Sequence, residues 1–278
     1  MIDAHQHFLD PGLVDYPWMS GPYERLRRTF LPDDLLPALE AAGVERTIVV
    51  QACNDIDETH MLLGMAATDP RTAGVVGWAD LTDPAVGDVL TDLRGRPGGD
   101  RLVGIRHLVH DEPDPEWLLR PDVGRGLAAV ADAGLVFDLL VRARELPAAS
   151  VIVDRHPDLR FVIDHLAKPP IASGALEPWA TLLRPLGARD HVAVKLSGLV
   201  TEADWQRWSD ADLAPYIDWA LEVFGPDRLM FGSDWPVCLL AATYDRVVRA
   251  LVDALGDLSA PERATILTGN ATRVYGLT

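Results

Sequence analysis

The 278-residue chain is poor in cysteine, carries fewer basic than acidic residues and lacks long apolar runs. Its two cysteines, Cys53 and Cys238, lie far apart in the sequence, which predicts two reduced thiols rather than a disulfide framework. No stretch approaches the roughly 20 apolar residues that a transmembrane helix needs. The first residues, Met-Ile-Asp-Ala-His-Gln-His, contain neither a basic segment nor an apolar signal core. We therefore expect a cytoplasmic protein without a membrane span.

The charge balance is strongly acidic. The chain has 42 Asp and Glu residues against 25 Lys and Arg residues, which gives a formal net charge of −17. A field of this sign repels phosphate backbones and anionic lipids. The charge therefore argues against nucleic-acid or membrane partners.

Eight short β-rich segments alternate with segments of helical pattern along the whole chain. The expected strands are Ile2–His7, Thr47–Gln51, Gly74–Ala79, Val103–His107, Leu135–Val141, Arg160–His165, Val192–Ser197 and Leu229–Gly232. The expected helices are Pro32–Ala42, Asp57–Thr68, Ala85–Leu93, Gly124–Ala133, Leu146–His156, Leu176–Leu186, Asp212–Phe224, Tyr244–Leu255 and Pro261–Thr268. Such alternation predicts parallel strands joined by helical crossovers.

Eight strand–helix units of this kind fit a closed barrel, a fold that is typically about 250 residues long. We therefore predict an α/β protein with a single (β/α)8 TIM barrel domain over residues 1–278. An open, doubly wound sheet has the same local pattern, but the Gly-x-Gly-x-x-Gly fingerprint of dinucleotide binding does not follow the first strand. The loops Phe8–Thr29 and Asp111–Asp122 are long and rich in Pro, Trp and Asp, and we expect them to cover the site.

In a parallel barrel the reacting groups stand at the carboxyl ends of the strands. Seven of the eight expected strand ends carry side chains that bind, titrate or stack. The candidates for substrate binding are Gln51, Trp78, Arg106, His107, Lys195 and Trp235. Because Arg106 and His107 are adjacent, only one of them faces the barrel interior. A lysine inside a barrel is costly unless it is paired, so Lys195 either pairs with Asp138 or Asp164 or contacts the substrate.

The candidates for catalysis are His5, His7, His165 and Asp234. His5 and His7 are two residues apart on the first strand, so both imidazoles point to the same side. Neutral imidazoles suit a metal or an anionic intermediate, whereas the alternative is a pair of turn histidines without a ligand. Asp234 is either a turn former or a general base, and His165 either a core histidine or a ligand. His60, His110, His156 and His191 are interpreted as ordinary loop or surface residues.

Several segments, taken together and in order, resemble the amidohydrolase superfamily. They are "IDAHQHF", "GIRHLV", "FVIDHLAKP", "VAVKLSGL" and "LMFGSDWPV", and they extend from the first strand to the last. Within the superfamily they are similar to the amidohydrolase-2 branch, which contains sugar-acid lactonases and 2-pyrone-4,6-dicarboxylate lactonase. The resemblance implies catalytic roles for His5, His7, His165 and Asp234, and the same four residues as ligands if one metal is bound.

The resemblance also implies hydrolysis of a sugar-acid lactone of the L-fucono-, L-rhamnono- or L-galactono-lactone type. Two departures bear on the metal: no lysine stands on the fourth or fifth strand, where binuclear relatives carry a bridging carbamate, and the fifth strand has no histidine. Some members of this branch work without a metal, so the resemblance allows one Zn²⁺ without requiring it. The alternatives are a pyrone-dicarboxylate-type lactonase, a metal-dependent decarboxylase of the same superfamily and a barrel that binds a sugar acid without turning it over.

Overall fold

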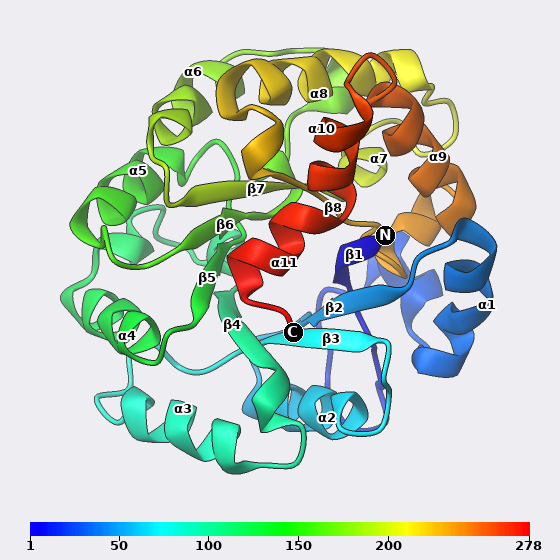
Figure 1. Ribbon diagram of the computed structural model, residues 1–278. Coiled ribbons are helices and arrows are strands. Elements are labelled where there is room, and N and C mark those ends of the chain that lie inside the picture. Colours follow the sequence, from blue (N-terminus) through cyan, green and yellow to red (C-terminus); the bar gives the residue numbers. More distant parts are fainter.

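Eight parallel strands pair in chain order, β1 to β8, in the computed structural model, which describes residues 1–278. The strands are β1 (Ile2–Gln6), β2 (Arg46–Val50), β3 (Thr72–Gly77), β4 (Leu102–His107), β5 (Val136–Leu139), β6 (Phe161–Ile163), β7 (Val192–Leu196) and β8 (Leu229–Phe231). The helices are α1 (Pro32–Ala42), α2 (Ile56–Ala66), α3 (Val86–Gly95), α4 (Pro121–Asp132), α5 (Leu146–Arg155), α6 (Trp179–Leu183), α7 (Leu199–Glu202), α8 (Asp210–Phe224), α9 (Tyr244–Ala254), α10 (Ala260–Ala264) and α11 (Asn270–Tyr275). Most of these helices surround the strands as an outer layer (Figure 1). The predicted (β/α)8 barrel is confirmed.

Hydrogen bonds close the barrel where the end of β8 meets β1. The His7 amide donates to the Trp235 carbonyl at 2.7 Å, and the Asp234 amide donates to the His5 carbonyl at 2.8 Å. Below them, the buried Asp3 carboxylate accepts the Ser233 amide at 2.9 Å. The two segments farthest apart in the sequence are thus joined directly at the carboxyl end of the barrel.

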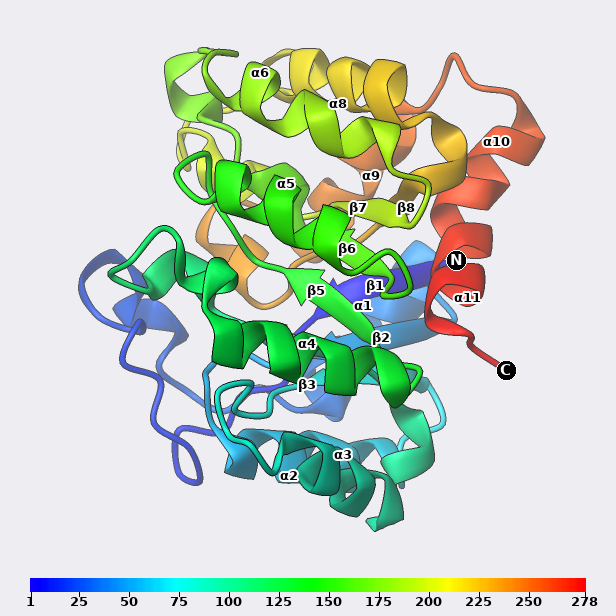
Figure 2. The same cartoon turned by 90° about the vertical axis from the view of Figure 1, so that its left-hand side faces the viewer.

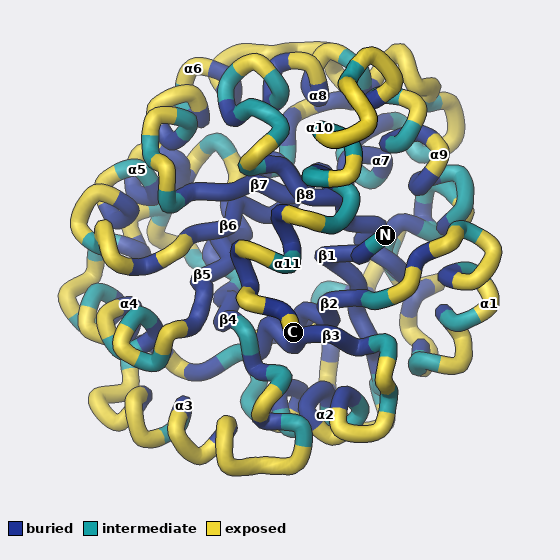
Figure 3. Tube along the Cα trace, in the orientation of Figure 1, coloured by how far each residue is buried: buried dark blue, intermediate teal, exposed yellow.

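The core has two layers. A large apolar cluster of 73 residues fills the space between the strands and the helices. A second cluster of 14 residues lies inside the barrel and includes Ala271, Val274 and Tyr275 of α11. Helix α11 crosses the end of the barrel where the strands begin (Figures 1 and 2). The strands are buried, whereas the helices expose their outer sides (Figure 3). The C-terminal helix therefore closes the end opposite to the expected site.

Most expected elements differ from the observed ones by one to three residues at an end, and three of the differences have a visible cause. Strand β6 ends at Ile163 rather than at His165, because Asp164–Ala167 form a tight helical turn. The helix expected over Leu176–Leu186 is reduced to α6, since Pro178 precedes it and Pro185, which has no amide proton, starts a separate 3-10 turn. The last expected helix, Pro261–Thr268, continues through a π-helical turn at Thr265–Gly269 into α11.

Both cysteines are buried and unpaired, as predicted. None of the helices combines the length and the apolar character required to cross a bilayer.

Candidate active site

An irregularity in β1 turns the two histidines of that strand into the barrel. Between Asp3 and Gln6 the pairing with β2 shifts, so that three steps on β1 face two steps on β2. Ala4 belongs to the apolar cluster inside the barrel, yet its neighbour His5 also faces inward, where it contacts Asp164. One extra residue in a strand reverses which side chains face the core. The bulge therefore brings His5 and His7 to the mouth of the barrel together.

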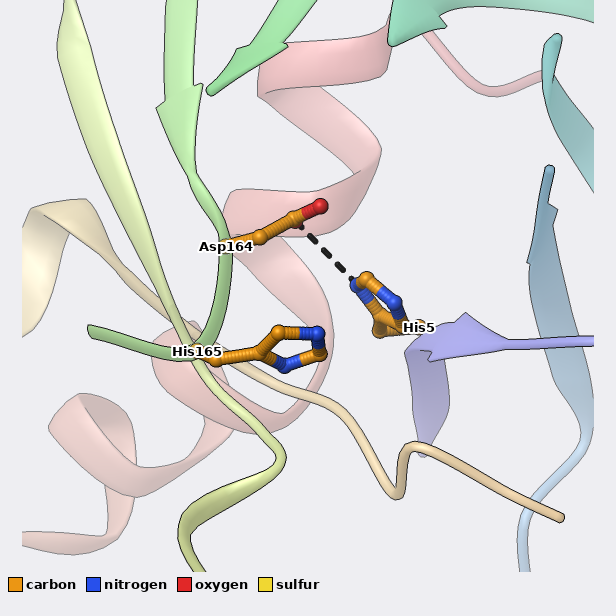
Figure 4. A group of neighbouring side chains, drawn as sticks. All are labelled: His5, Asp164 and His165. Atoms are coloured by element: carbon orange, nitrogen blue, oxygen red, sulfur yellow. Dashed lines mark hydrogen bonds and ion pairs between the residues drawn. The ribbon is translucent and has the colours of Figure 1, made fainter. Parts of the chain in front are cut away.

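The four predicted catalytic residues meet at this mouth, and all of them are buried. His7 Nε2 lies 3.3 Å from His5 Nε2 and 3.2 Å from Asp234 Oδ1. Asp234 Oδ1 is 3.9 Å from His5 Nε2 and also 3.9 Å from His165 Nε2. Figure 4 shows His5 on β1 and His165 on the turn after β6 with their rings close together, and Asp164 beside His5. The structure thus places residues from β1 and from the ends of β6 and β8 around one point.

Hydrogen bonds determine which ring nitrogens are free. His7 Nδ1 lies 2.7 Å from the Val50 carbonyl oxygen, which only accepts, so Nδ1 carries the proton. Asp164 Oδ1, which accepts, lies 3.2 Å from His5 Nδ1, so His5 also carries its proton on Nδ1 and its Nε2 accepts from Arg106 Nη1 at 3.3 Å. Both Nε2 atoms are therefore unprotonated acceptors.

Three acceptors consequently converge: His5 Nε2, His7 Nε2 and Asp234 Oδ1. These atoms are 3.2–3.9 Å apart. Two ligand atoms of a tetrahedral zinc ion, each bonded to the metal at about 2.0–2.1 Å, lie about 3.3 Å from each other. These three residues form one of two buried clusters suited to a metal, the other being His5, Asp164 and His165. The convergence of acceptors fits a divalent cation or a proton shared between His7 and Asp234, because either would remove the repulsion between lone pairs.

Burial and neighbouring charges set the ionisation of these groups. Desolvation lowers the pKa of His5 and of His165 well below the usual value, which keeps both rings neutral. Burial alone would raise the pKa of Asp234, but His165 and the hydrogen bond with His7 outweigh it and lower the pKa. At neutral pH the site therefore contains neutral imidazoles beside an ionised carboxylate.

The backbone is in the left-handed region at Asp234 and along the turn that follows β6. Asp234 has φ +59°, and the four residues from His165 to Lys168 have φ between +52° and +55°. Such conformations cost roughly 1–2 kcal/mol for a residue with a side chain and often occur at functional sites. Gly198, at φ +63°, passes so close that a Cβ there would lie 2.5 Å from His165 Nδ1. The left-handed turn keeps His165 facing the site and also brings Lys168 to its edge.

A cavity of about 230 Å³ opens above this centre. Asp234, His7, His165 and Arg106 form its floor. Its other lining residues are Trp18, Tyr23, Ala52, Leu108, His110, Asp111, Leu140, Arg142, Lys168 and Val237. The two loops expected to cover the site both contribute, through Trp18 and Tyr23 and through Asp111. The cavity combines an aromatic wall, cationic groups and a carboxylate, which suits a small polar ring.

Arg106 is the only one of the six candidate substrate-binding residues that lines this cavity. Of the adjacent pair, Arg106 faces inward, whereas His107 stacks on Trp117 with ring centroids 4.0 Å apart. Trp78 donates through Nε1 to His107 Nδ1 at 3.1 Å, and Gln51 Nε2 donates to the Arg106 carbonyl at 3.1 Å.

The remaining two candidates also pack behind the cavity. Trp235 packs edge-on against Phe8 and Phe30. Lys195 is paired with both Asp138 and Asp164 inside the barrel. The structural alternative for Lys195 is thus the one observed.

His110, interpreted from the sequence as an ordinary loop or surface residue, lines the cavity instead. It sits in a 3-10 turn just after β4, and its amide bonds to the Leu140 carbonyl at the end of β5 at 3.2 Å. Tyr23, Arg142 and Lys168 also line the cavity but were not among the candidates. The sequence could have indicated these residues only by their positions, just after strand ends or in the first loop. The direction in which a loop side chain points depends on the folded chain.

The fold and the site together define a barrel with a histidine–carboxylate centre at the carboxyl ends of its strands. The amidohydrolase family model, Amidohydro_2, matches residues 2–277, and the chain belongs to this family. An L-fucono-1,5-lactonase from Burkholderia multivorans is 43% identical over 99% of this chain and 96% of its own. An L-fucono-1,5-lactonase from Burkholderia ambifaria is 38% identical over 99% and 94%.

A crystal structure of an amidohydrolase from Burkholderia multivorans with bound zinc superposes with a TM-score of 0.94. It is 41% identical, and the match covers 100% of this chain and 99% of that one.

Proposed function

We propose that this protein hydrolyses a sugar-acid lactone, with lactones of the L-fucono-1,5-lactone type as the first candidates and L-rhamnono- and L-galactono-lactones as the next. One observation carries the proposal: the buried Asp234 carboxylate lines a polar cavity of about 230 Å³ together with His7 and His165. The two lactonase relatives, similar over almost their whole length, support the substrate class.

In the proposed reaction Asp234 accepts a proton from a water molecule as its oxygen attacks the lactone carbonyl carbon. The carbonyl oxygen becomes an oxyanion, and the ring C–O bond then breaks. The ring oxygen takes the proton back from Asp234, and the product is a hydroxy acid that releases its own proton at neutral pH. A carboxylate whose pKa is below its usual value is ready to accept the first proton across the neutral range.

Arg106 is the group we assign to the oxyanion. Its Nη1 atom is held by Asp164 Oδ2 at 2.8 Å, and its Nη2 atom bonds to the Gln51 carbonyl. The Nε atom is buried without a partner although the side chain lines the cavity. An unsatisfied buried donor is costly, and a substrate oxygen would satisfy it. Donors fixed in this way stabilise charge that develops during the reaction.

We propose one divalent cation, with zinc as the candidate, held by His5, His7 and Asp234, with His165 as a fourth ligand. When bound, it would polarise the carbonyl and lower the pKa of water. Five residues expected from the sequence to contact the substrate lie outside the cavity. We propose that they support the site instead: Gln51, Trp78, His107, Lys195 and Trp235. We also retain the cytoplasm as the expected location, where two buried free thiols are stable.

A pH-indicator assay over a panel of aldonolactones, with and without chelator, tests this function. The panel includes a pyrone dicarboxylate and an aromatic carboxylic acid, the latter monitored for CO₂ release. Proton release with an aldonolactone, lost in Asp234→Asn, is the expected result. Release of CO₂ without lactone turnover would instead identify a decarboxylase, and saturable binding without either product would identify a binding protein.

A further inference from the structure

A buried network of charges lies directly beneath His5, inside the barrel. The Lys195 ammonium is fully buried and contacts Asp138 Oδ2 at 2.5 Å and Asp164 Oδ1 at 3.0 Å. Asp164 is also the acceptor for His5 Nδ1, as Figure 4 shows. Arg106 completes the network through its ion pair with Asp164. Two carboxylates and two cations thus balance, and His5 is attached to the set through one oxygen of Asp164.

The network reaches the C-terminal helix through one hydroxyl. Tyr275 of α11 places its hydroxyl 2.8 Å from Asp138 Oδ1 and 2.9 Å from Asp138 Oδ2. The ring of Tyr275 also lies under Lys195, with Nζ 5.4 Å from the ring centroid. Tyr275 is buried and is the last residue of α11, the helix that crosses the end of the barrel where the strands begin (Figure 2). Its hydroxyl therefore has no access to a substrate, and any effect on the reaction must pass through Asp138 and Lys195.

We propose that Tyr275 is a positioning residue: its hydroxyl, acting through Asp138, Lys195 and Asp164, keeps the proton of His5 on Nδ1 and the lone pair of Nε2 toward the active centre. This inference rests on the proposed function only for its zinc-affinity and turnover readouts.

The physical reason lies in how Asp164 Oδ1 is shared. Two donors, Lys195 Nζ and His5 Nδ1, approach this one oxygen at 3.0 and 3.2 Å. Lys195 Nζ also lies 3.3 Å from His5 Nδ1, so an ammonium drawn away from Asp138 could donate to that nitrogen and force the His5 proton onto Nε2. Burial raises the pKa of Asp138 to about 6 even beside Lys195. The Asp138 carboxylate therefore stays ionised only with the help of the hydrogen bonds it accepts. The Tyr275 hydroxyl is one of the donors.

Tyr275→Phe is the test because it removes the hydroxyl and retains the ring beneath Lys195. Tyr216→Phe is the matched control: Tyr216 is also buried, and its hydroxyl donates to the Ala175 carbonyl at 3.0 Å, away from the network. Asp138→Asn is a second variant that removes the charge itself. All proteins are labelled with ¹⁵N-histidine, and the His5 signals are assigned by their loss in His5→Asn.

In the wild type and in Tyr216→Phe we expect the His5 nitrogen shifts of a ring protonated on Nδ1. In Tyr275→Phe they should move toward a mixture of both tautomers, and further in Asp138→Asn. Zinc affinity, measured by competition with a chelator, should fall about tenfold in Tyr275→Phe, the lower end of the range for groups that orient metal ligands. The turnover number for the lactone should fall by a similar factor with KM unchanged, and activity should be native in Tyr216→Phe.

A purely structural role would lower the melting temperature of both tyrosine variants alike and leave the His5 shifts unchanged. That outcome, or a shift of equal size in Tyr216→Phe, would overturn the proposal. The NMR comparison requires neither metal nor turnover. It therefore decides the positioning role even if no lactone is hydrolysed and the proposed function fails.

Discussion

Gly198 offers a test of how tightly the catalytic histidine is held. In Gly198→Ala the new Cβ would lie 2.5 Å from His165 Nδ1 and 3.1 Å from Asp234 Oδ2. Carbon atoms pack at about 3.5 Å or more, so the His165 ring, whose Nδ1 contacts Ser197 Oγ at 2.9 Å, would have to retreat by about 1 Å. A displacement of about 1 Å in a reacting group costs on the order of 100-fold in rate.

The backbone adds a second effect that must be separated from the first. Gly198 has φ +63°, where alanine is strained by roughly 1–2 kcal/mol. Gly134, at φ +66° and with nothing within 4 Å of a built Cβ, provides the control because alanine there meets the same strain without the clash. Both variants should therefore lose stability in urea unfolding, and Gly198→Ala should lose at least as much as Gly134→Ala because the clash adds to the strain. Only Gly198→Ala should lose lactone turnover, about 100-fold in kcat/KM by the pH-indicator assay.

Two results would refute this reasoning. Native turnover in Gly198→Ala would mean that the position of His165 does not limit the reaction. An equal loss of turnover in Gly134→Ala would mean that general loosening of the barrel, rather than displacement of one ring, explains the effect.

Further predictions concern the base, the oxyanion donor, the cation and a buried acid. Asp234→Asn should lower kcat by about 10²- to 10⁴-fold because the general base is lost, with an unchanged circular dichroism spectrum; a native rate would remove Asp234 from the mechanism. Arg106→Gln should lower kcat by about 10²- to 10³-fold in steady-state assays, and a change in KM alone would assign it to ground-state binding. Dialysis against chelator should lower activity, and zinc should restore it to a stoichiometry of one ion per chain by metal analysis; full activity with no bound metal would favour the shared proton. Burial raises the pKa of Glu58 from its ordinary 4.5 to about 7. The neutral acid therefore contributes stability below about pH 4.5 that is lost as the pH rises through 7. Relative to Glu58→Gln, the wild type should lose about 2–3 kcal/mol of unfolding free energy between about pH 5 and pH 8.5; parallel curves in urea titrations would contradict this.

The sequence alone determined the order of the elements and which four polar residues gather at the mouth of the barrel. Strand and helix periodicities are local, so eight strand–helix units could be counted without knowing how they pack. Parallel strands bring their carboxyl ends to one face, and for that reason His5, His7, His165 and Asp234 could be expected together although 227 positions separate His7 from Asp234.

Only the tertiary structure decided which of the remaining polar residues reach the cavity. The bulge in β1 selects the face of His5, the left-handed turn after β6 brings Lys168 to the edge, and the two-fold pairing of Lys195 withdraws it from the substrate. His110 reaches the cavity through a hydrogen bond of its amide to the end of β5. Each of these outcomes depends on a contact between segments distant in sequence, or on a backbone turn that these contacts stabilise. Local sequence patterns do not predict such contacts, because residue type and spacing determine the periodicity of a segment but not which segments pack against it.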